Sequence, residues 1–385
     1  MILIAGMHRS GTSAVSRLLN LLGVYLGEEL LEPKEGVNAA GFWENEIGVE
    51  INEALFGSLD SEWFDYLPWP DRWWEKAPAT DFLPIIRSFV RNSLGGRRLV
   101  GVKDPRLCRL LPLWHAAAAA ETERVSVVLP FRHPDEVAES LFKRDCIPHE
   151  AGYFLWLTYQ LDAQRYSERL PHIFVPFDAL FEDWKAVAQR IAEVCGVSWQ
   201  TDPSAIEDEI ADEIRPELRH RAPSGLHAGS SKARELALGV FEEMNTASEA
   251  GRTVQFDSAR GEYHRLLDAA GTQPRIALEA MRRMIEARQE LMSLGGEHAY
   301  ALEVVNERDR TIEDLNAEIS KRIAENAERE QELVRKRERL DVQWLRLREL
   351  RDRVRDQDTE IRGLKGRLAE LENHWLWRWY RRLRH

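Results

Sequence analysis

Cysteine is scarce in this sequence, and long apolar runs are missing. The three cysteines, Cys108, Cys146 and Cys195, form no C-x-x-C pair. A sparse, odd set predicts buried thiols in a reducing compartment rather than disulfides. No run of about 18 apolar residues occurs, which predicts that no helix spans a membrane. The apolar N-terminal run is too short for a signal peptide. We therefore expect a cytoplasmic protein, with peripheral contact at the inner membrane face left open.

Excess positive charge is also lacking. The chain of 385 residues carries 53 lysines and arginines against 65 aspartates and glutamates, a formal net charge of −12. General binding of nucleic acid requires a basic surface, so this balance predicts no nucleic-acid partner. The histidines and cysteines show no spacing typical of a ligand cluster, and we expect no metal site.

Four segments have the composition of buried strands, and helical patterns separate them. The strands are expected over residues 2–5, 98–102, 125–131 and 172–177, and the first of them is apolar on both faces. Helices are expected over 12–23, from Pro134 to about Arg144, and after 177 to about Val194. Alternating strands and helices predict an α/β fold with a parallel, doubly wound sheet of the P-loop type flanked by helices. Ligands of such sheets bind at the carboxyl ends of the strands.

The stretch MILIAGMHRSGTSAVSRLL predicts a strand, a glycine turn and the start of a helix. Gly6 and Gly11 have the spacing of the P-loop pattern G-x-x-x-x-G-K-[ST], but Thr12 occupies the lysine position. Such a turn directs backbone N–H groups at an anion, and Ser13 adds a hydroxyl group. Arg9 is the cation of the loop. The pattern predicts a site for one phosphate group, without a metal ion.

Polar residues also follow the next two predicted strands. Lys103 and Asp104 end the second strand, and Arg132 ends the third. Ser140 lies eight residues after Arg132, where the intervening helix can turn both side chains toward one point. A guanidinium and a hydroxyl group together predict a second phosphate site.

With these two sites, the sequence resembles the sulfotransferases that use 3′-phosphoadenosine 5′-phosphosulfate (PAPS). The segments GMHRSGTSAVSRLL, GFWEN, VKDPRLC and ELRHR are similar to a bacterial branch of that family, and the resemblance covers about residues 1–222. It implies PAPS as co-substrate and no metal. The residues implied to hold the 5′-phosphosulfate are those of the loop: Gly6, Arg9, Ser10, Gly11, Thr12 and Ser13. Arg132 and Ser140 are implied to hold the 3′-phosphate.

Sulfuryl transfer also needs a base for the acceptor hydroxyl and cations for the developing charge. Arg9 and Lys103 are the candidate cations. Glu44, in AAGFWENE, is the first candidate for the base, and Asp104 is the second. The resemblance implies a hydroxyl or amine acceptor, expected to be a cell-envelope carbohydrate or glycolipid. Two alternatives stay open: a P-loop nucleotide kinase and a non-catalytic coiled-coil scaffold.

The C-terminal part differs in composition and in the spacing of its apolar residues. We expect a sulfotransferase-like P-loop α/β domain over 1–222 and a linker with a helical region over 223–302. Heptad spacing from Ile312 to Leu368 predicts a coiled coil over 303–372, and with it a homo-oligomer or a partner protein. The second set of heptad positions, the d positions, contains fewer apolar residues, so a solitary charged helix remains an alternative. The tail over 373–385, HWLWRWYRRLRH with the residue before it, combines aromatic rings and arginines, as membrane-surface segments do. A tail packed against the coiled coil is the other reading.

Overall fold

The computed structural model describes residues 1–31, 43–213 and 231–294, together with 362–363, 365–367 and 370. The chain divides into two compact units, Met1–Asp309 and Arg310–His385. Except for those few positions, the predicted coiled coil over 303–372 and the whole tail over 373–385 lie outside the described residues. The boundary predicted at residue 222 also lies outside them.

Four short parallel strands form the sheet of the first unit. They are β1 (Ile2–Ile4), β2 (Gly101–Lys103), β3 (Ser126–Phe131) and β4 (His172–Pro176). Their order is β2-β1-β3-β4, with β1 paired in parallel to both β2 and β3. The four predicted strands and the parallel α/β sheet are confirmed, although β2 begins at Gly101 rather than at residue 98.

The two faces of the sheet bury separate cores. Leu3 and Val127 belong to one core, and Ile4 and Val128 belong to the other, because successive strand residues point to opposite faces. Helices α1 (Thr12–Leu21) and α7 (Ala179–Cys195) supply the second core. Helices α4 (Leu107–Ala119), α5 (Pro134–Asp145) and α6 (His149–Ser167) supply the first. Coverage on both faces explains why β1 and β3 carry apolar residues at successive positions, which point to opposite faces.

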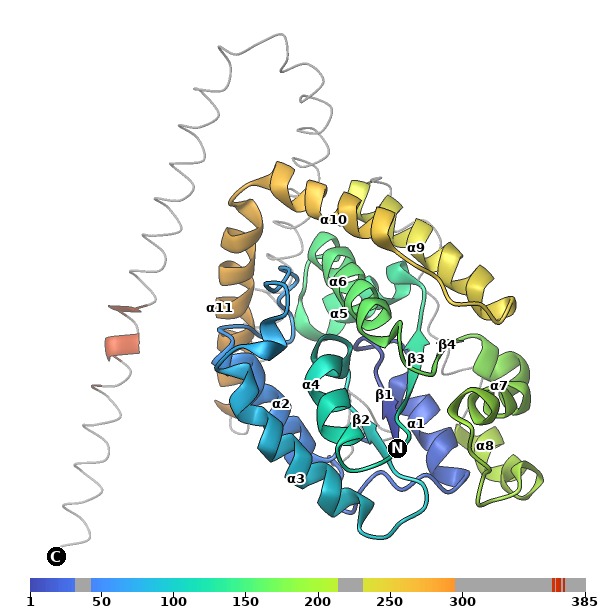
Figure 1. Ribbon diagram of the computed structural model, residues 1–385. Coiled ribbons are helices and arrows are strands. Elements are labelled where there is room, and N and C mark those ends of the chain that lie inside the picture. The colour runs from blue at the N-terminus through green and yellow to red at the C-terminus, as the bar shows by residue number, and fades with distance from the viewer. Residues whose placement is uncertain (32–42, 214–230, 295–361, 364, 368–369, 371–385) are drawn as a thin grey trace, which may run out of the picture. The chain divides into compact units, whose positions relative to one another are not determined.

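Five of the remaining helices extend the first core. They are α2 (Glu46–Ser58), α3 (Leu83–Leu94), α9 (Lys232–Glu249), α10 (Asp257–Ala270) and α11 (Gln273–Leu294). Helix α8 (Glu207–Glu213) adds Ile210 to the second core. Helix α9 packs against α5, α6 and β4, and α10 packs against α9 (Figure 1). The helices after residue 230 therefore share a core with the α/β sheet.

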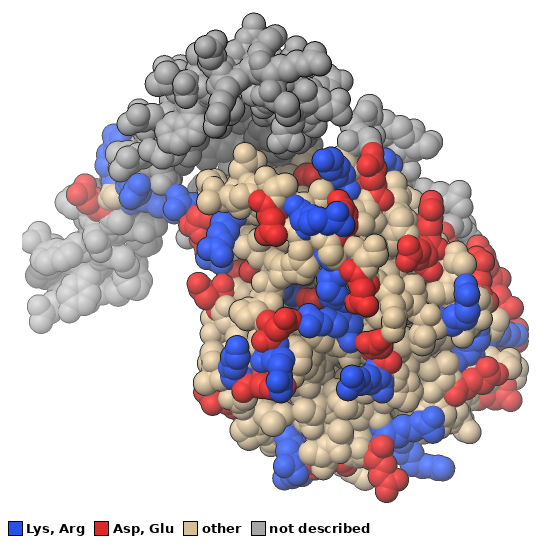
Figure 2. Space-filling model, turned by 45° about the horizontal axis from the view of Figure 1, so that its top comes forward, with Lys and Arg blue, Asp and Glu red and all other residues tan. Residues whose placement is uncertain are grey.

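Charges of both signs are mixed over the surface. On the face drawn in Figure 2, lysine and arginine side chains lie among aspartates and glutamates. The absence of a nucleic-acid partner remains a prediction. Among the described helices, none is both long enough and apolar enough to cross a lipid bilayer.

Candidate active site

The predicted glycine loop connects β1 to α1 at the carboxyl end of the sheet. A Cβ atom on Gly6 would lie 2.5 Å from the carbonyl oxygen of Pro130. Gly11 has a φ of +83°, and a Cβ atom there would lie 2.2 Å from the ring of Phe177. Both positions thus require glycine. Helix α1 has no side-chain hydrogen bond at its N-cap, so its first amides can meet an anion.

Three buried polar atoms near this loop have no hydrogen-bond partner within the described part of the chain. They are Ser10 Oγ, His8 Nε2 and Glu44 Oε2. Ser10 is fully buried and Glu44 is nearly so. An unpaired buried polar group costs about 1–3 kcal/mol. Such groups are available to hydrogen-bond a polar ligand.

Arg9 leaves the loop and reaches α5. Its Nε atom donates a hydrogen bond to Ser140 Oγ at 2.7 Å. Burial, together with the nearby charges of Arg144 and Arg132, lowers the pKa of Arg9 to about 10. Arg9 belongs to the glycine loop, and its guanidinium also reaches Ser140 of the second predicted phosphate site, near Arg132 and Arg144.

Arg132, a residue of the second predicted phosphate site, is linked to the glycine loop through Phe177. Its Nε atom donates to Glu136 Oε2 at 2.6 Å, and its guanidinium lies over the Phe177 ring, 4.6 Å from the ring centre. The backbone carbonyl of Arg132 accepts a hydrogen bond of 3.0 Å from the Trp156 indole. Phe177 thus touches both the glycine loop at Gly11 and the arginine of the second site.

Lys103 and Glu44 form a buried ion pair beside the loop. Lys103 Nζ donates to Glu44 Oε1, and it lies 3.4 Å from Ser13 Oγ. The two side chains are 2% and 8% exposed. Burial raises the pKa of Glu44 and lowers the pKa of Lys103, and their mutual attraction only partly offsets both effects. Both shifts favour the neutral form of the group concerned.

Asp104 has different surroundings. Its carboxylate accepts hydrogen bonds from Asn52 Nδ2 at 2.9 Å, from the Arg106 backbone N–H at 2.8 Å, and from the Arg106 guanidinium. Asn52 Oδ1 in turn accepts from the Trp114 indole at 2.8 Å. Both oxygens of Asp104 are thus engaged in a network that ties α2 to α4.

Two further residues, His8 and Arg144, lie near the loop, although neither was a candidate from the sequence. The His8 ring lies 4.5 Å from Trp63, measured between ring centres. Burial holds the pKa of His8 well below its usual value, and the charges of Arg144, Arg106, Lys103 and Arg9 act in the same direction. Arg144 follows Ser140 by four residues, on the same side of α5. His8 could have been found from its place inside the glycine loop, and Arg144 from this helical spacing.

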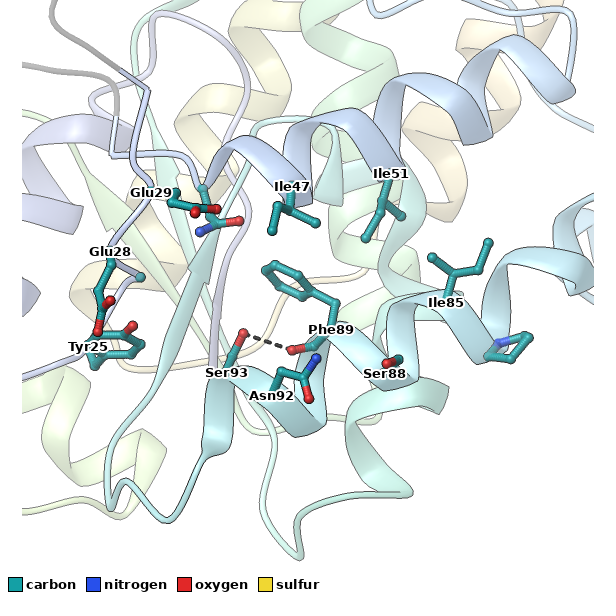
Figure 3. Close-up of a pocket in the computed structure, with 13 residues that line it drawn as sticks. Tyr25, Glu28, Glu29, Ile47, Ile51, Ile85, Ser88, Phe89, Asn92 and Ser93 are labelled. Atoms are coloured by element: carbon teal, nitrogen blue, oxygen red, sulfur yellow. Dashed lines mark hydrogen bonds between the residues drawn. The ribbon is translucent and has the colours of Figure 1, made fainter.

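Within the described ranges, no three histidine, cysteine, aspartate or glutamate residues are grouped so that they could hold a metal ion. A groove of about 680 Å³ lies between α2 and α3, away from the loop (Figure 3). Ile47 and Ile51 of α2 face Ile85 and Phe89 of α3 across it. None of the predicted site residues lines this groove, so it is separate from the candidate active site.

Two solved structures to which the chain is similar are sulfotransferase domains. The domain from the Synechococcus PCC 7002 olefin synthase is 17% identical with a TM-score of 0.35, and the match covers 63% of this chain and 94% of that one. The domain from the curacin biosynthetic pathway is 14% identical with a TM-score of 0.33, over 63% and 97%. No protein-family model matches the chain, and no curated protein matches it significantly. Structural similarity at these TM-scores and identities is no argument for an activity, so the argument for an activity depends on the residues of the site.

Proposed function

We propose that this chain transfers a sulfuryl group from PAPS to a hydroxyl or amine group of an acceptor. The observation that carries the proposal is the 2.7 Å hydrogen bond between Arg9 and Ser140. It joins the glycine loop to the cluster around Arg132, so two anion sites at neighbouring strand ends meet. A nucleotide with separate 3′ and 5′ phosphate groups matches this pair of sites. The loop lysine that contacts β- and γ-phosphates in nucleoside triphosphatases is replaced by Thr12.

The residues present are suited to PAPS. The glycine loop, with the unpaired Ser10 hydroxyl and the uncapped start of α1, would hold the 5′-phosphosulfate. Arg132 and Ser140 would hold the 3′-phosphate. We also assign Arg9 to the 3′-phosphate, although the family resemblance placed it with the 5′-phosphosulfate, because its guanidinium already contacts Ser140.

Glu44 is the proton acceptor in this proposal. Its Oε2 atom has no partner among the described residues, whereas both oxygens of Asp104 are engaged. PAPS supplies the activated sulfuryl group, and Glu44 takes the proton that the acceptor hydroxyl loses. Once Glu44 is neutral, the positive charge of Lys103 is no longer balanced by its partner. Lys103, beside Ser13, then stabilises negative charge on the oxygen that leaves the sulfuryl group.

The acceptor is proposed from the family resemblance alone, as a cell-envelope carbohydrate or glycolipid. Association through the predicted coiled coil and contact of the tail with a membrane surface are likewise proposals. Both would keep the catalytic unit near such an acceptor.

Ligand-induced thermal stabilisation tests the donor. PAP, the 3′,5′-bisphosphate product, should stabilise the protein without Mg²⁺ by about 2.7 kcal/mol at 100 times its dissociation constant. Stabilisation by Mg-ATP but not by PAP would instead indicate a P-loop kinase, and no effect of either would favour a non-catalytic scaffold. Transfer of labelled sulfate from PAPS to an envelope glycan extract then tests the acceptor class.

A further inference from the structure

Helix α9 is attached to the first turn of α5 by a paired hydrogen bond. Arg234, in the first turn of α9, donates from Nε and Nη2 to the two carboxylate oxygens of Asp135, at 2.8 and 2.7 Å. The Tyr153 hydroxyl of α6 donates to the same carboxylate at 2.8 Å. Burial alone would raise the pKa of Asp135, but the hydrogen bonds from Arg234 and Tyr153 outweigh it and lower the pKa. The carboxylate is therefore held as an anion by its two partners.

Helix α9 also contacts the residues on either side of Arg132. The ring of Phe241 lies 5.8 Å from Phe131 and 4.9 Å from His133, measured between ring centres. Phe131 and His133 are the two neighbours of Arg132 in the chain. Helix α9 therefore packs against the side chains that precede and follow Arg132, and Arg234 binds Asp135 three residues further on.

From these contacts we infer that α9 is a positioning element of the nucleotide site, with Arg234 as its main residue. Asp135 belongs to the same helix as Ser140, and Arg132 directly precedes that helix. By fixing the first turn of α5, Arg234 keeps the Arg132 guanidinium and the Ser140 hydroxyl at the distance that a 3′-phosphate requires. A loosened turn would let the arginine adopt other rotamers, and the lost order would lower affinity for that phosphate alone.

This inference rests on the proposed function, because it assigns the 3′-phosphate to Arg132 and Ser140. It adds a role for a helix that the sequence analysis placed outside the catalytic domain. Arg234 touches no proposed ligand group in this assignment, so it acts through Asp135 and is a positioning residue.

The experiment compares two probes, PAP and 5′-AMP, by calorimetry with the full-length protein. The two ligands differ in the 3′-phosphate, so the ratio of their affinities measures recognition of that group. Arg234→Ala should reduce the ratio about tenfold, the lower end of what loss of a supporting partner costs at metal sites. The affinity for 5′-AMP should stay unchanged. Arg234→Lys, which retains the charge but only one hydrogen bond, should recover part of the ratio.

Asp135→Asn provides an independent variant that removes the charge and keeps the shape. Arg234→Ala and Asp135→Asn together should reduce the ratio no more than either alone, because they interrupt the same contact. Arg265→Ala is the matched control, since the exposed Arg265 of α10 forms an ion pair with Glu262 of the same helix, at 2.7 Å.

The outcomes separate the two claims. A wild-type protein that binds PAP no more tightly than 5′-AMP overturns the proposed function and the inference together. A wild-type preference for PAP that Arg234→Ala and Asp135→Asn leave intact overturns only the role of α9. Equal losses for both ligands would show that α9 merely stabilises the fold, which also contradicts positioning.

Discussion

Glutamine in place of Glu44 tests the buried ion pair and the proposed base at once. The Lys103 and Glu44 side chains are 2% and 8% exposed, so Glu44→Gln leaves a lysine charge in the interior without its partner. Loss of one member of a buried pair costs about 3–5 kcal/mol. Glutamine can still accept a hydrogen bond from Lys103, so we expect the free energy of unfolding to fall by about 3 kcal/mol, the lower end of that range. Urea denaturation measures it.

The loss should depend on pH in a defined direction. Burial holds the pKa of Lys103 below its usual value, and the charge of Glu44 opposes that shift. Without Glu44 the pKa of Lys103 in the folded state falls further, while its value in the unfolded chain stays at about 10.4. Between those two values the unfolded chain binds more protons, so stability rises with pH. The deficit of Glu44→Gln should therefore shrink as the pH is raised from neutral toward 10.

Activity gives the second readout. If Glu44 takes the acceptor proton, turnover should fall by about 10²–10⁴ while PAP affinity is retained. Asp104→Asn is compared under the same conditions, and a large loss of turnover there with none in Glu44→Gln would exchange the two roles. The double variant Glu44→Gln with Lys103→Met removes both charges and should recover part of the stability.

Glu75→Gln is the matched control for stability, because Glu75 pairs with Arg72 in exposed positions. It should leave the free energy of unfolding unchanged within error. A Glu44→Gln protein as stable as this control at neutral pH would refute the reasoning about a buried pair. Full turnover in Glu44→Gln would refute its role as the base.

Further predictions concern the loop, the second site and the C-terminal part. Arg132→Ala should weaken PAP binding in calorimetry by about 1.5–3 kcal/mol, the range for a charge-assisted hydrogen bond, and unchanged affinity would remove it from the 3′-phosphate site. Gly11→Ala should destabilise the fold and abolish PAP binding, because its Cβ atom would meet Phe177 at 2.2 Å. His8 stays neutral in the folded state, so between pH 7 and 5 only the unfolded histidine gains a proton. The wild type should therefore lose more stability than His8→Gln over this pH range. An equal change in the free energy of unfolding of both proteins, measured by urea denaturation at each pH, would contradict the burial of His8. Deletion of residues 303–385 should convert an oligomer to a monomer in light scattering, and a full-length monomer at micromolar concentration would contradict the heptad interpretation.

Local features of the sequence determined the sheet and the loop. The strand over residues 2–5 is apolar on both faces, which predicts a sheet covered on both sides, and the structure confirms two cores there. The spacing of Gly6 and Gly11 likewise predicts a turn between β1 and α1. These features depend on residues close together in the chain, so a single segment contains the information.

Pairing between distant side chains was decided by the tertiary structure alone. Arg9 meets Ser140 across 131 positions, and Glu44 meets Lys103 across 59. The sequence identified these four residues as candidates, but it assigned Arg9 to the loop and could not show that Glu44 and Lys103 neutralise each other. Which charges meet depends on how helices and strands pack, and which buried atoms stay unpaired follows from that packing. The burial that sets the pKa values of His8, Glu44 and Lys103 therefore exists only once the chain has folded.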